Sequence, residues 1–176
     1  MKRLIIKLLA LSFMLTISLG SFSQTDENMK AMVAKMNDEM MELLKAGRYE
    51  AMAKYYDINL ISMPNYRVME KGWQLILNNN LGRKKGGYQV ADGKKTTTDL
   101  IIGEDMMVDL GQYTLTINFP GLEKPKVDNG KYMNVWRKGK DGSWRIVVET
   151  WNADKSPNAP AQPKPTMQPA GQPVKK

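Results

Sequence analysis

The chain of 176 residues contains no cysteine and no histidine. Without cysteine it forms no disulfide, and a lipoprotein anchor on a cysteine at a cleavage site is excluded. Without histidine it lacks the commonest general base near neutral pH, histidine-based metal sites, and Ser-His or Cys-His nucleophile systems. These absences argue against several chemistries before any motif is considered.

The first 23 residues have the pattern of a secretory signal peptide. Lys2, Arg3 and Lys7 form a basic start, and an apolar run follows from Leu8 to Leu19. The small residues of Ser21-Phe22-Ser23 then suit a cleavage site before Gln24. The apolar run is too short for a comfortable membrane span. We therefore expect an exported protein, periplasmic or secreted, that is not held in a membrane after cleavage.

The other end of the chain, residues 155–176, is rich in proline, glutamine and alanine. It has too few large apolar residues to offset its ordering entropy, so we expect a disordered tail. One domain over residues 24–154 remains, which is an ordinary domain size.

The formal charge of +8 is unevenly distributed. The signal peptide carries three basic residues and the tail four, and neither carries an acid. The remaining domain has 19 basic and 18 acidic residues, so it is nearly neutral. A nucleic-acid partner, which a basic total would otherwise suggest, is therefore not expected.

Helical patterns occupy the first half of the domain. Residues 25–47 carry an apolar stripe at helical spacing and end at Gly47. A short helix is predicted from Arg48 to Tyr56, then a strand ending at Pro64, a turn or edge strand over 65–72, and a third helix over 73–85.

Strand patterns fill the second half, at about 88–91, 95–103, 106–119, 130–138 and 143–152, separated by turn signals such as Ala91-Asp92-Gly93. Helices followed by long antiparallel strands indicate an α+β fold, with three N-terminal helices packed on one face of a curved, mostly antiparallel sheet.

The order of these elements resembles the nuclear transport factor 2-like superfamily, in particular its SnoaL-like and ketosteroid-isomerase-like branch. The segments that carry the resemblance are LLKAGRYEAMAKYYD, the pair Pro64 and Gly72 before the third helix, and GKYMNVWRKGKDGSWRIVVETWN. The resemblance covers roughly residues 28–152. It implies a cone-shaped fold that encloses a deep, mostly apolar pocket, and a homodimer formed through the outer sheet face.

The isomerase chemistry of that branch needs a carboxylate base, with a tyrosine and a protonated acid that donate to an oxyanion. By the resemblance, the tyrosine falls on Met40, the base on Met63 and the acid on Asn134. A thioether neither moves a proton nor donates a hydrogen bond, so the isomerase route is not expected. Relatives that depend on a His–Asp pair are excluded because the chain has no histidine.

Strand alternation places Tyr132, Asn134 and Trp136 on one face of their strand, and Arg145, Val147, Glu149 and Trp151 on one face of the last strand. The resemblance assigns the faces with Asn134 and Glu149 to the pocket. The opposite face of the last strand, with Trp144 and Ile146, would then be core beyond the pocket or an interface. The predicted ligand-binding residues are Asn134, Glu149, Trp151, Met63, Met40, Trp73, Tyr56, Tyr113 and Leu115.

Two residue groups have competing interpretations. The helical methionines Met29, Met32, Met36 and Met40 could supply thioether ligands for Cu(I), but the apolar residues that continue their stripe favour a flexible core or pocket lining. Glu149 could lie in the cavity beside Asn134, or could pair with Arg145 on the same strand face.

Three functions are consistent with these patterns. The first is a domain that binds a small apolar or amphipathic molecule, with Asn134 and Glu149 as its few polar contacts and with no cofactor or metal. The second is an enzyme, a lyase, isomerase or hydrolase, that uses Glu149 as acid or base. The third is a protein-interaction module. The replacements at Met40 and Met63 favour a non-enzyme.

Overall fold

The computed structural model describes residues 26–155. The predicted signal peptide, its cleavage site and residues 156–176 of the predicted tail lie outside the described residues. Residues 26–45 form the first helix, and the elements that follow are η1 (Tyr49–Tyr55), β1 (Tyr56–Met63), β2 (Glu70–Lys71), α2 (Trp73–Lys85), β3 (Gln89–Ile102), β4 (Met106–Asn118), β5 (Lys126–Lys138) and β6 (Trp144–Ala153). No helix in residues 26–155 is long and apolar enough to cross a membrane.

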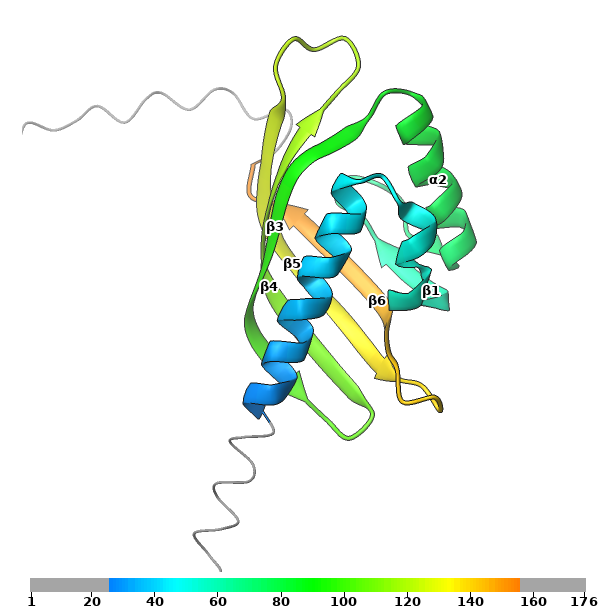
Figure 1. The fold of residues 1–176 in the computed structure, drawn as a ribbon, viewed down its shortest axis with the longest axis vertical. Helices are drawn as coiled ribbons and strands as arrows, with labels where there is room; N and C mark the ends of the chain where they lie inside the picture. Colours follow the sequence, from blue (N-terminus) through cyan, green and yellow to red (C-terminus); the bar gives the residue numbers. More distant parts are fainter. Residues whose placement is uncertain (1–25, 156–176) are drawn as a thin grey trace, which may run out of the picture.

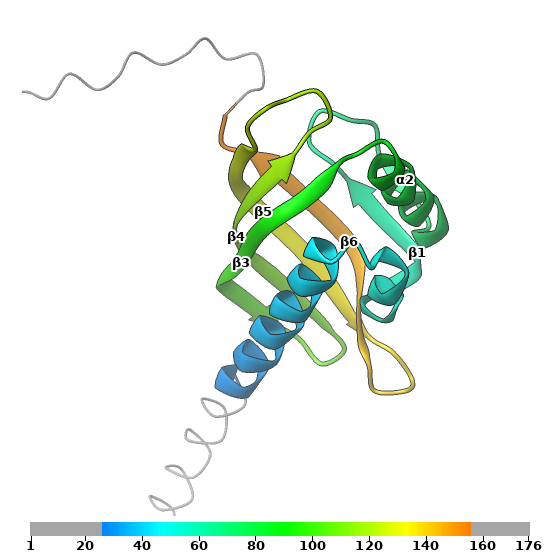
Figure 2. The ribbon, with the colours of Figure 1, turned by 45° about the horizontal axis from the view of Figure 1, so that its top comes forward.

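The six strands form one sheet in the order β2-β1-β6-β5-β4-β3. β1 and β6 run parallel, and every other neighbouring pair is antiparallel. The sheet curves around the first helix, which lies along its concave side, while α2 and η1 lie beside β1 (Figures 1 and 2). The predicted α+β class, with three helices on a curved, mostly antiparallel sheet, is confirmed.

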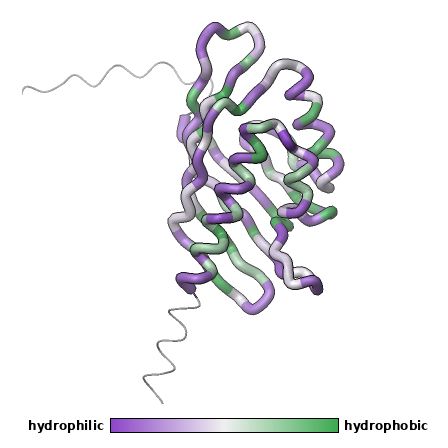
Figure 3. Tube along the Cα trace, in the orientation of Figure 1, coloured by the Kyte–Doolittle hydropathy of each residue, from purple (hydrophilic) through white to green (hydrophobic). Residues whose placement is uncertain are grey.

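The first helix lies against the sheet through the apolar stripe of its sequence. Val33 and Met40 are buried in one cluster with Met107 and Trp136 of the sheet. Hydrophobic and hydrophilic residues alternate along this helix, as expected for an element with one buried face (Figure 3). Gly47, two residues beyond the end of the helix, has a φ of 61°, in the left-handed region that favours glycine and terminates helices.

One predicted turn lies inside a strand. The Ala91-Asp92-Gly93 segment belongs to β3, where the pairing with β4 shifts register between Val90 and Asp92. A Cβ atom on Gly93 would lie 2.5 Å from Met41 Sδ, so this glycine permits a close approach of the first helix. The predicted turn residues therefore mark a bulge at Ala91 in β3.

Candidate functional site

A cavity of about 260 Å³ lies between the concave face of the sheet and the helices. Apolar side chains from the first helix, η1 and α2 form one wall, including Met40, Met52 and Ile76. Tyr56 and Trp73 stack at this wall with ring centroids 4.6 Å apart. The volume suits a molecule smaller than the drug-sized ligands that fill pockets of about 300–1,000 Å³.

A larger groove of about 490 Å³ lies between the first helix and β3. Exposed residues such as Lys30, Thr96 and Thr98 line it. Lys95 borders both hollows. We place the candidate site in the inner cavity because the buried polar groups lie there.

A row of polar residues crosses five strands on the concave face. The pairing register joins Asp109 of β4 to Asn134 of β5, Asn134 to Glu149 of β6, Glu149 to Ser62 of β1, and Ser62 to Glu70 of β2. Acids therefore alternate with neutral residues along the row. Direct neighbours on one face of a sheet have their Cβ atoms about 5 Å apart, so the spacing keeps the carboxylates from adjoining each other.

Glu149, in the middle of this row, is half-buried and accepts a hydrogen bond from a neighbouring strand. Ser62 Oγ donates to Glu149 Oε1 over 2.8 Å. Burial raises the pKa of Glu149 above its usual value, and the Ser62 hydrogen bond, the charge of Lys95 and the Tyr56 hydroxyl offset part of this effect. Burial and the neighbouring charge of Glu149 raise the pKa of Tyr56. The site thus holds a carboxyl group whose proton is retained to higher pH than in water.

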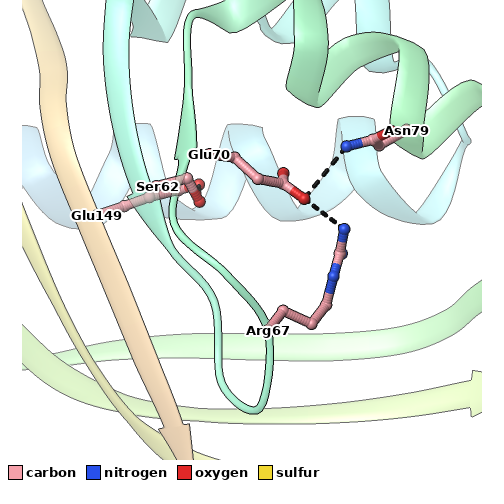
Figure 4. A network of polar contacts seen from close by, with 5 residues as sticks. All are labelled: Ser62, Arg67, Glu70, Asn79 and Glu149. Carbon is pink, nitrogen blue, oxygen red and sulfur yellow. Dashed lines mark hydrogen bonds and ion pairs between the residues drawn. The ribbon is translucent and has the colours of Figure 1, made fainter.

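Glu70 lies at one end of the row with partners of its own. Figure 4 shows its Oε1 atom between the Arg67 guanidinium, with which it forms an ion pair, and Asn79 Nδ2, which donates over 3.2 Å. Arg67 comes from the loop between β1 and β2, and Asn79 from α2. This cluster ties both segments to the cavity wall beside Ser62 and Glu149.

Asp109 lies at the other end of the row and is fully buried. Asn37 Nδ2 of the first helix donates to its Oδ2 over 3.2 Å, and the Tyr132 hydroxyl donates to its Oδ1 over 3.1 Å. Burial raises the pKa of Tyr132. The cluster fastens the first helix to the sheet through polar contacts, in addition to the apolar stripe.

Lys95 of β3 extends over the Tyr132 ring, with its Nζ 4.1 Å from the ring centroid. Burial lowers the pKa of its ammonium group, while the charges of Glu149 and Asp109 act in the opposite direction. Lys95 lines the cavity together with Tyr132, Asn134 and Glu149. The wall therefore combines a cation and an acid with aromatic and amide groups.

No protein-family model matches the sequence, and no curated protein matches it either. Similarity is found among solved structures. A superfamily protein of the nuclear transport factor 2-like type from Salmonella enterica serovar Typhimurium has a TM-score of 0.63 at 14% identity, covering 75% of this chain and 95% of that one. The chain has the nuclear transport factor 2-like fold.

Two further structures have the same fold. A protein of this type with a cystatin-like fold from Novosphingobium aromaticivorans has a TM-score of 0.58 at 12% identity, with 79% of this chain and 90% of that one covered. A ketosteroid isomerase-like protein from Erwinia carotovora atroseptica has a TM-score of 0.53 at 12% identity, with 67% and 98% covered. Identities this low establish the fold alone.

Eight of the nine residues predicted from the sequence line the cavity. They are Asn134, Glu149, Trp151, Met40, Trp73, Tyr56, Tyr113 and Leu115. Met63, the ninth, was placed wrongly. Leu60 and Ser62 are buried on the inner face of β1, so alternation turns Met63 to the outer face, where it is 38% exposed.

The expected face of β6 was also partly wrong. The pairing of β5 with β6 shifts register between Val135 and Trp136, so that Trp136 pairs with Ile146 and Val135 with Val148. This bulge at Val147 reverses the alternation before Glu149. Ile146 therefore lies on the same face as Trp136 and Glu149, and not on the opposite face. It is fully buried in the core cluster, and Trp144 packs against that cluster, so the expected core position of these two residues is confirmed.

The same bulge separates Arg145 from Glu149. Arg145 forms an ion pair with Asp141 across the β5–β6 turn, with Nη2 and Oδ2 2.6 Å apart. The pKa of Asp141 is accordingly lowered to about 2, chiefly by the Arg145 hydrogen bond. The alternative in which Glu149 pairs with Arg145 is therefore contradicted.

Several site residues were missed in the sequence. Ser62, Lys95 and Glu70 line the cavity, and Asp109 lies in the same polar row. Their number corrects the expectation of only two polar contacts. No group of three or more acidic, cysteine or histidine side chains within residues 26–155 is placed to hold a metal ion. Met40 packs in the core cluster and Met29, Met32 and Met36 pack against it.

Proposed function

We propose that this protein binds a small molecule in the inner cavity and that Glu149 is the main polar anchor for it. The observation that carries this proposal is the position of the Glu149 carboxyl, which is held by Ser62 in the polar part of a cavity whose other walls are apolar and aromatic. Concave, largely apolar sites with a few convergent polar groups are typical of small-molecule binding. The predicted signal peptide leads us to propose further that the protein acts outside the cytoplasm.

The carboxyl group of Glu149 is suited to a ligand that offers a hydrogen-bond donor. Its raised pKa favours two arrangements, a neutral carboxyl that exchanges hydrogen bonds or a carboxylate that a donor from the ligand stabilises. Trp73 and Trp151 line the same cavity and provide flat apolar surfaces for the body of the ligand. A donor-bearing, partly apolar molecule fits this wall.

The test is to identify what the protein carries. Protein purified without denaturation from its host would be examined by native mass spectrometry, and released molecules would be identified after denaturation. Binding would then be compared in the parent and in Glu149→Gln. We expect affinity to fall at least about tenfold in the variant, because a hydrogen bond to a charged group contributes roughly 1.5–3 kcal/mol.

Glu104→Gln is the matched control, since Glu104 lies exposed in the β3–β4 turn. It should bind as the parent does. A parent that carries no small molecule, together with equal binding of every tested compound by Glu149→Gln and the parent, would contradict the proposal.

An enzyme is the second candidate. The raised pKa of a buried carboxyl next to a tyrosine is the property of an acid or base catalyst. Incubation of the retained molecule with fresh protein distinguishes the two candidates. Chemical conversion by the parent, abolished in Glu149→Gln, would establish the enzyme, and unchanged ligand would favour binding alone.

A further inference from the structure

Lys95 has an unusual position for a lysine in a polar strand. Its neighbours Lys94 and Thr96 are exposed, whereas Lys95 points to the concave face and lines the cavity. It pairs in register with Tyr113, another cavity residue. The sheet therefore directs one of the two adjacent lysines, and not the other, into the site.

The ammonium group of Lys95 has no direct counter-ion among the described residues. Within residues 26–155, no carboxylate oxygen lies within 4.0 Å of its Nζ atom. The Nζ atom lies over the face of the Tyr132 ring. Lys95 is half-buried. An ammonium group that is withdrawn from water is costly unless it is paired and hydrogen-bonded, and this group has three N–H donors.

The neighbouring acids are occupied by other groups. Both oxygens of Asp109 accept hydrogen bonds, from Asn37 and from Tyr132. Glu149 accepts from Ser62. Their charges oppose the lowering of the Lys95 pKa by burial, and they act without direct contact with the ammonium group.

A second donor without a partner lies in the same wall. Asn134 is 2% exposed, and its Nδ2 atom has no hydrogen-bond partner among the described residues. Tyr132, under the Lys95 ammonium, precedes Asn134 by two residues on the same strand face. Because neighbouring atoms cover Nδ2, we assign the direct contact with a ligand to Lys95. Asn134 lies beside this contact without making it.

We propose that the molecule bound in the cavity carries a carboxylate group and that Lys95 pairs with this group. The inference rests on the proposed function and specifies the class of its ligand as a small organic carboxylate. The apolar body of such a molecule would lie against Trp151 and the methionines of the opposite wall. A carboxylate would supply the acceptor that the ammonium group lacks.

Matched probes of different charge test this inference. Phenylacetate, phenylacetamide and phenethylamine share an aromatic body and differ in the charge of the polar group, and isobutyrate with isobutyramide repeats the comparison at smaller size. Binding to the purified protein would be measured by calorimetry and by the fluorescence of the cavity tryptophans. We expect at least one carboxylate to bind at least about tenfold more tightly than its amide, a difference of roughly 1.4 kcal/mol.

Three variants locate the cation responsible. Lys95→Met should remove the preference for the carboxylate, and Lys94→Met, next to it on the exposed face, should retain it. Lys95→Arg keeps the charge and should retain part of the preference, which guards against loss of folding in Lys95→Met. Arg83→Met tests the cation that α2 contributes to the cavity wall and should also retain the preference.

The assignment would be overturned if the carboxylate and its amide bound equally, or if the amine bound most tightly. It would also be overturned if Arg83→Met, and not Lys95→Met, lost the preference for the carboxylate. Failure of every carboxylate to bind would overturn it as well. The proposed function would survive these outcomes if the molecule retained from the host is neutral or cationic and its binding is weakened in Glu149→Gln. A parent that carries and binds nothing would contradict both.

Discussion

Ser62 Oγ donates to Glu149 Oε1 over 2.8 Å, across the parallel pair formed by β1 and β6. The two residues are distant in the sequence and are neighbours in register. The bond gives the half-buried carboxyl one hydrogen-bond partner, while desolvation still raises its pKa. Glu149 thus has a structural contact and an unfavourable buried charge at the same time.

We predict that Glu149→Gln leaves the domain as stable as the parent or more stable at neutral pH. The glutamine retains an oxygen that accepts from Ser62, while the buried charge is removed. Because the pKa of Glu149 is raised on folding, the parent loses stability as the pH rises from about 4 through the folded pKa, and the glutamine variant lacks this dependence. Thermal melts from pH 4 to pH 8 should therefore show a difference that grows with pH.

Ser62→Ala provides the complementary measurement. It removes the donor and leaves the acid, so this variant should be less stable than the parent at neutral pH by about 1–3 kcal/mol. The same substitution in the Glu149→Gln background should cost less, since the acceptor there is uncharged. A Glu149→Gln domain that melts well below the parent at pH 7 would show that the carboxylate is a stabilising part of the scaffold.

A separate prediction concerns Arg145→Met. Arg145 pairs with Asp141, so its loss should raise the pKa of Asp141 from about 2 toward the ordinary value of about 3.9. The pKa of Glu149 should not change. Because the folded pKa of Asp141 is lowered, the stability that this pair contributes is present above about pH 4 and is lost as the pH falls toward 2. Carboxyl titration by nuclear magnetic resonance in parent and variant measures the pKa of both groups. A change in the pKa of Glu149 in the variant would show that Glu149 pairs with Arg145.

Periodicity in the sequence predicted much of the fold and of the cavity wall. The apolar stripe of the first helix and the alternation around Asn134 on β5 were sufficient to place those faces correctly. Bulges were not predictable from periodicity, because one additional residue at Val147 reverses the alternation without changing the composition of the strand. The wrong strand faces expected for Ile146 and Arg145, relative to Glu149, follow from that single residue.

The cavity position of Lys95 could not be predicted from the sequence for a different reason. Its strand reads Lys94-Lys95-Thr96-Thr97, in which polar residues occupy both faces, so alternation of hydropathy gave no inner face. A lysine is ordinarily expected in solvent. The cavity position of Lys95 depends on its register with Tyr113, a contact between two strands that one strand cannot reveal.

Asn37 tests the attachment of the first helix to the sheet. Asn37→Leu should lower the free energy of unfolding by about 1–3 kcal/mol, since the buried carboxylate of Asp109 loses one of its donors. The loss should be smaller in an Asp109→Asn background, where no charge remains to be stabilised. Urea unfolding of the four proteins in this cycle measures the coupling. Additive effects would show that the hydrogen bond between the two residues contributes little.

The last prediction concerns two glycines that tyrosine rings cover. Gly111 pairs with Tyr132 across β4 and β5, and Gly130 pairs with Tyr113. A Cβ atom on Gly111 would clash with the Thr96 carbonyl oxygen and would lie 2.7 Å from Tyr132 Cε1. Gly111→Ala should therefore displace the ring that lies under the Lys95 ammonium and lower the free energy of unfolding by about 1–3 kcal/mol.

Gly82→Ala is the control for that substitution. A Cβ atom on Gly82 meets no atom within 4 Å, and the residue lies inside α2. Alanine there should raise the free energy of unfolding by about 0.5–1 kcal/mol, since it restricts the unfolded chain and favours helix. Urea unfolding should thus move the two variants in opposite directions. If Gly111→Ala were as stable as the parent and bound ligands equally well, the Tyr132 ring would have no role in placing Lys95, and the close approach at Gly111 would be without consequence for the site.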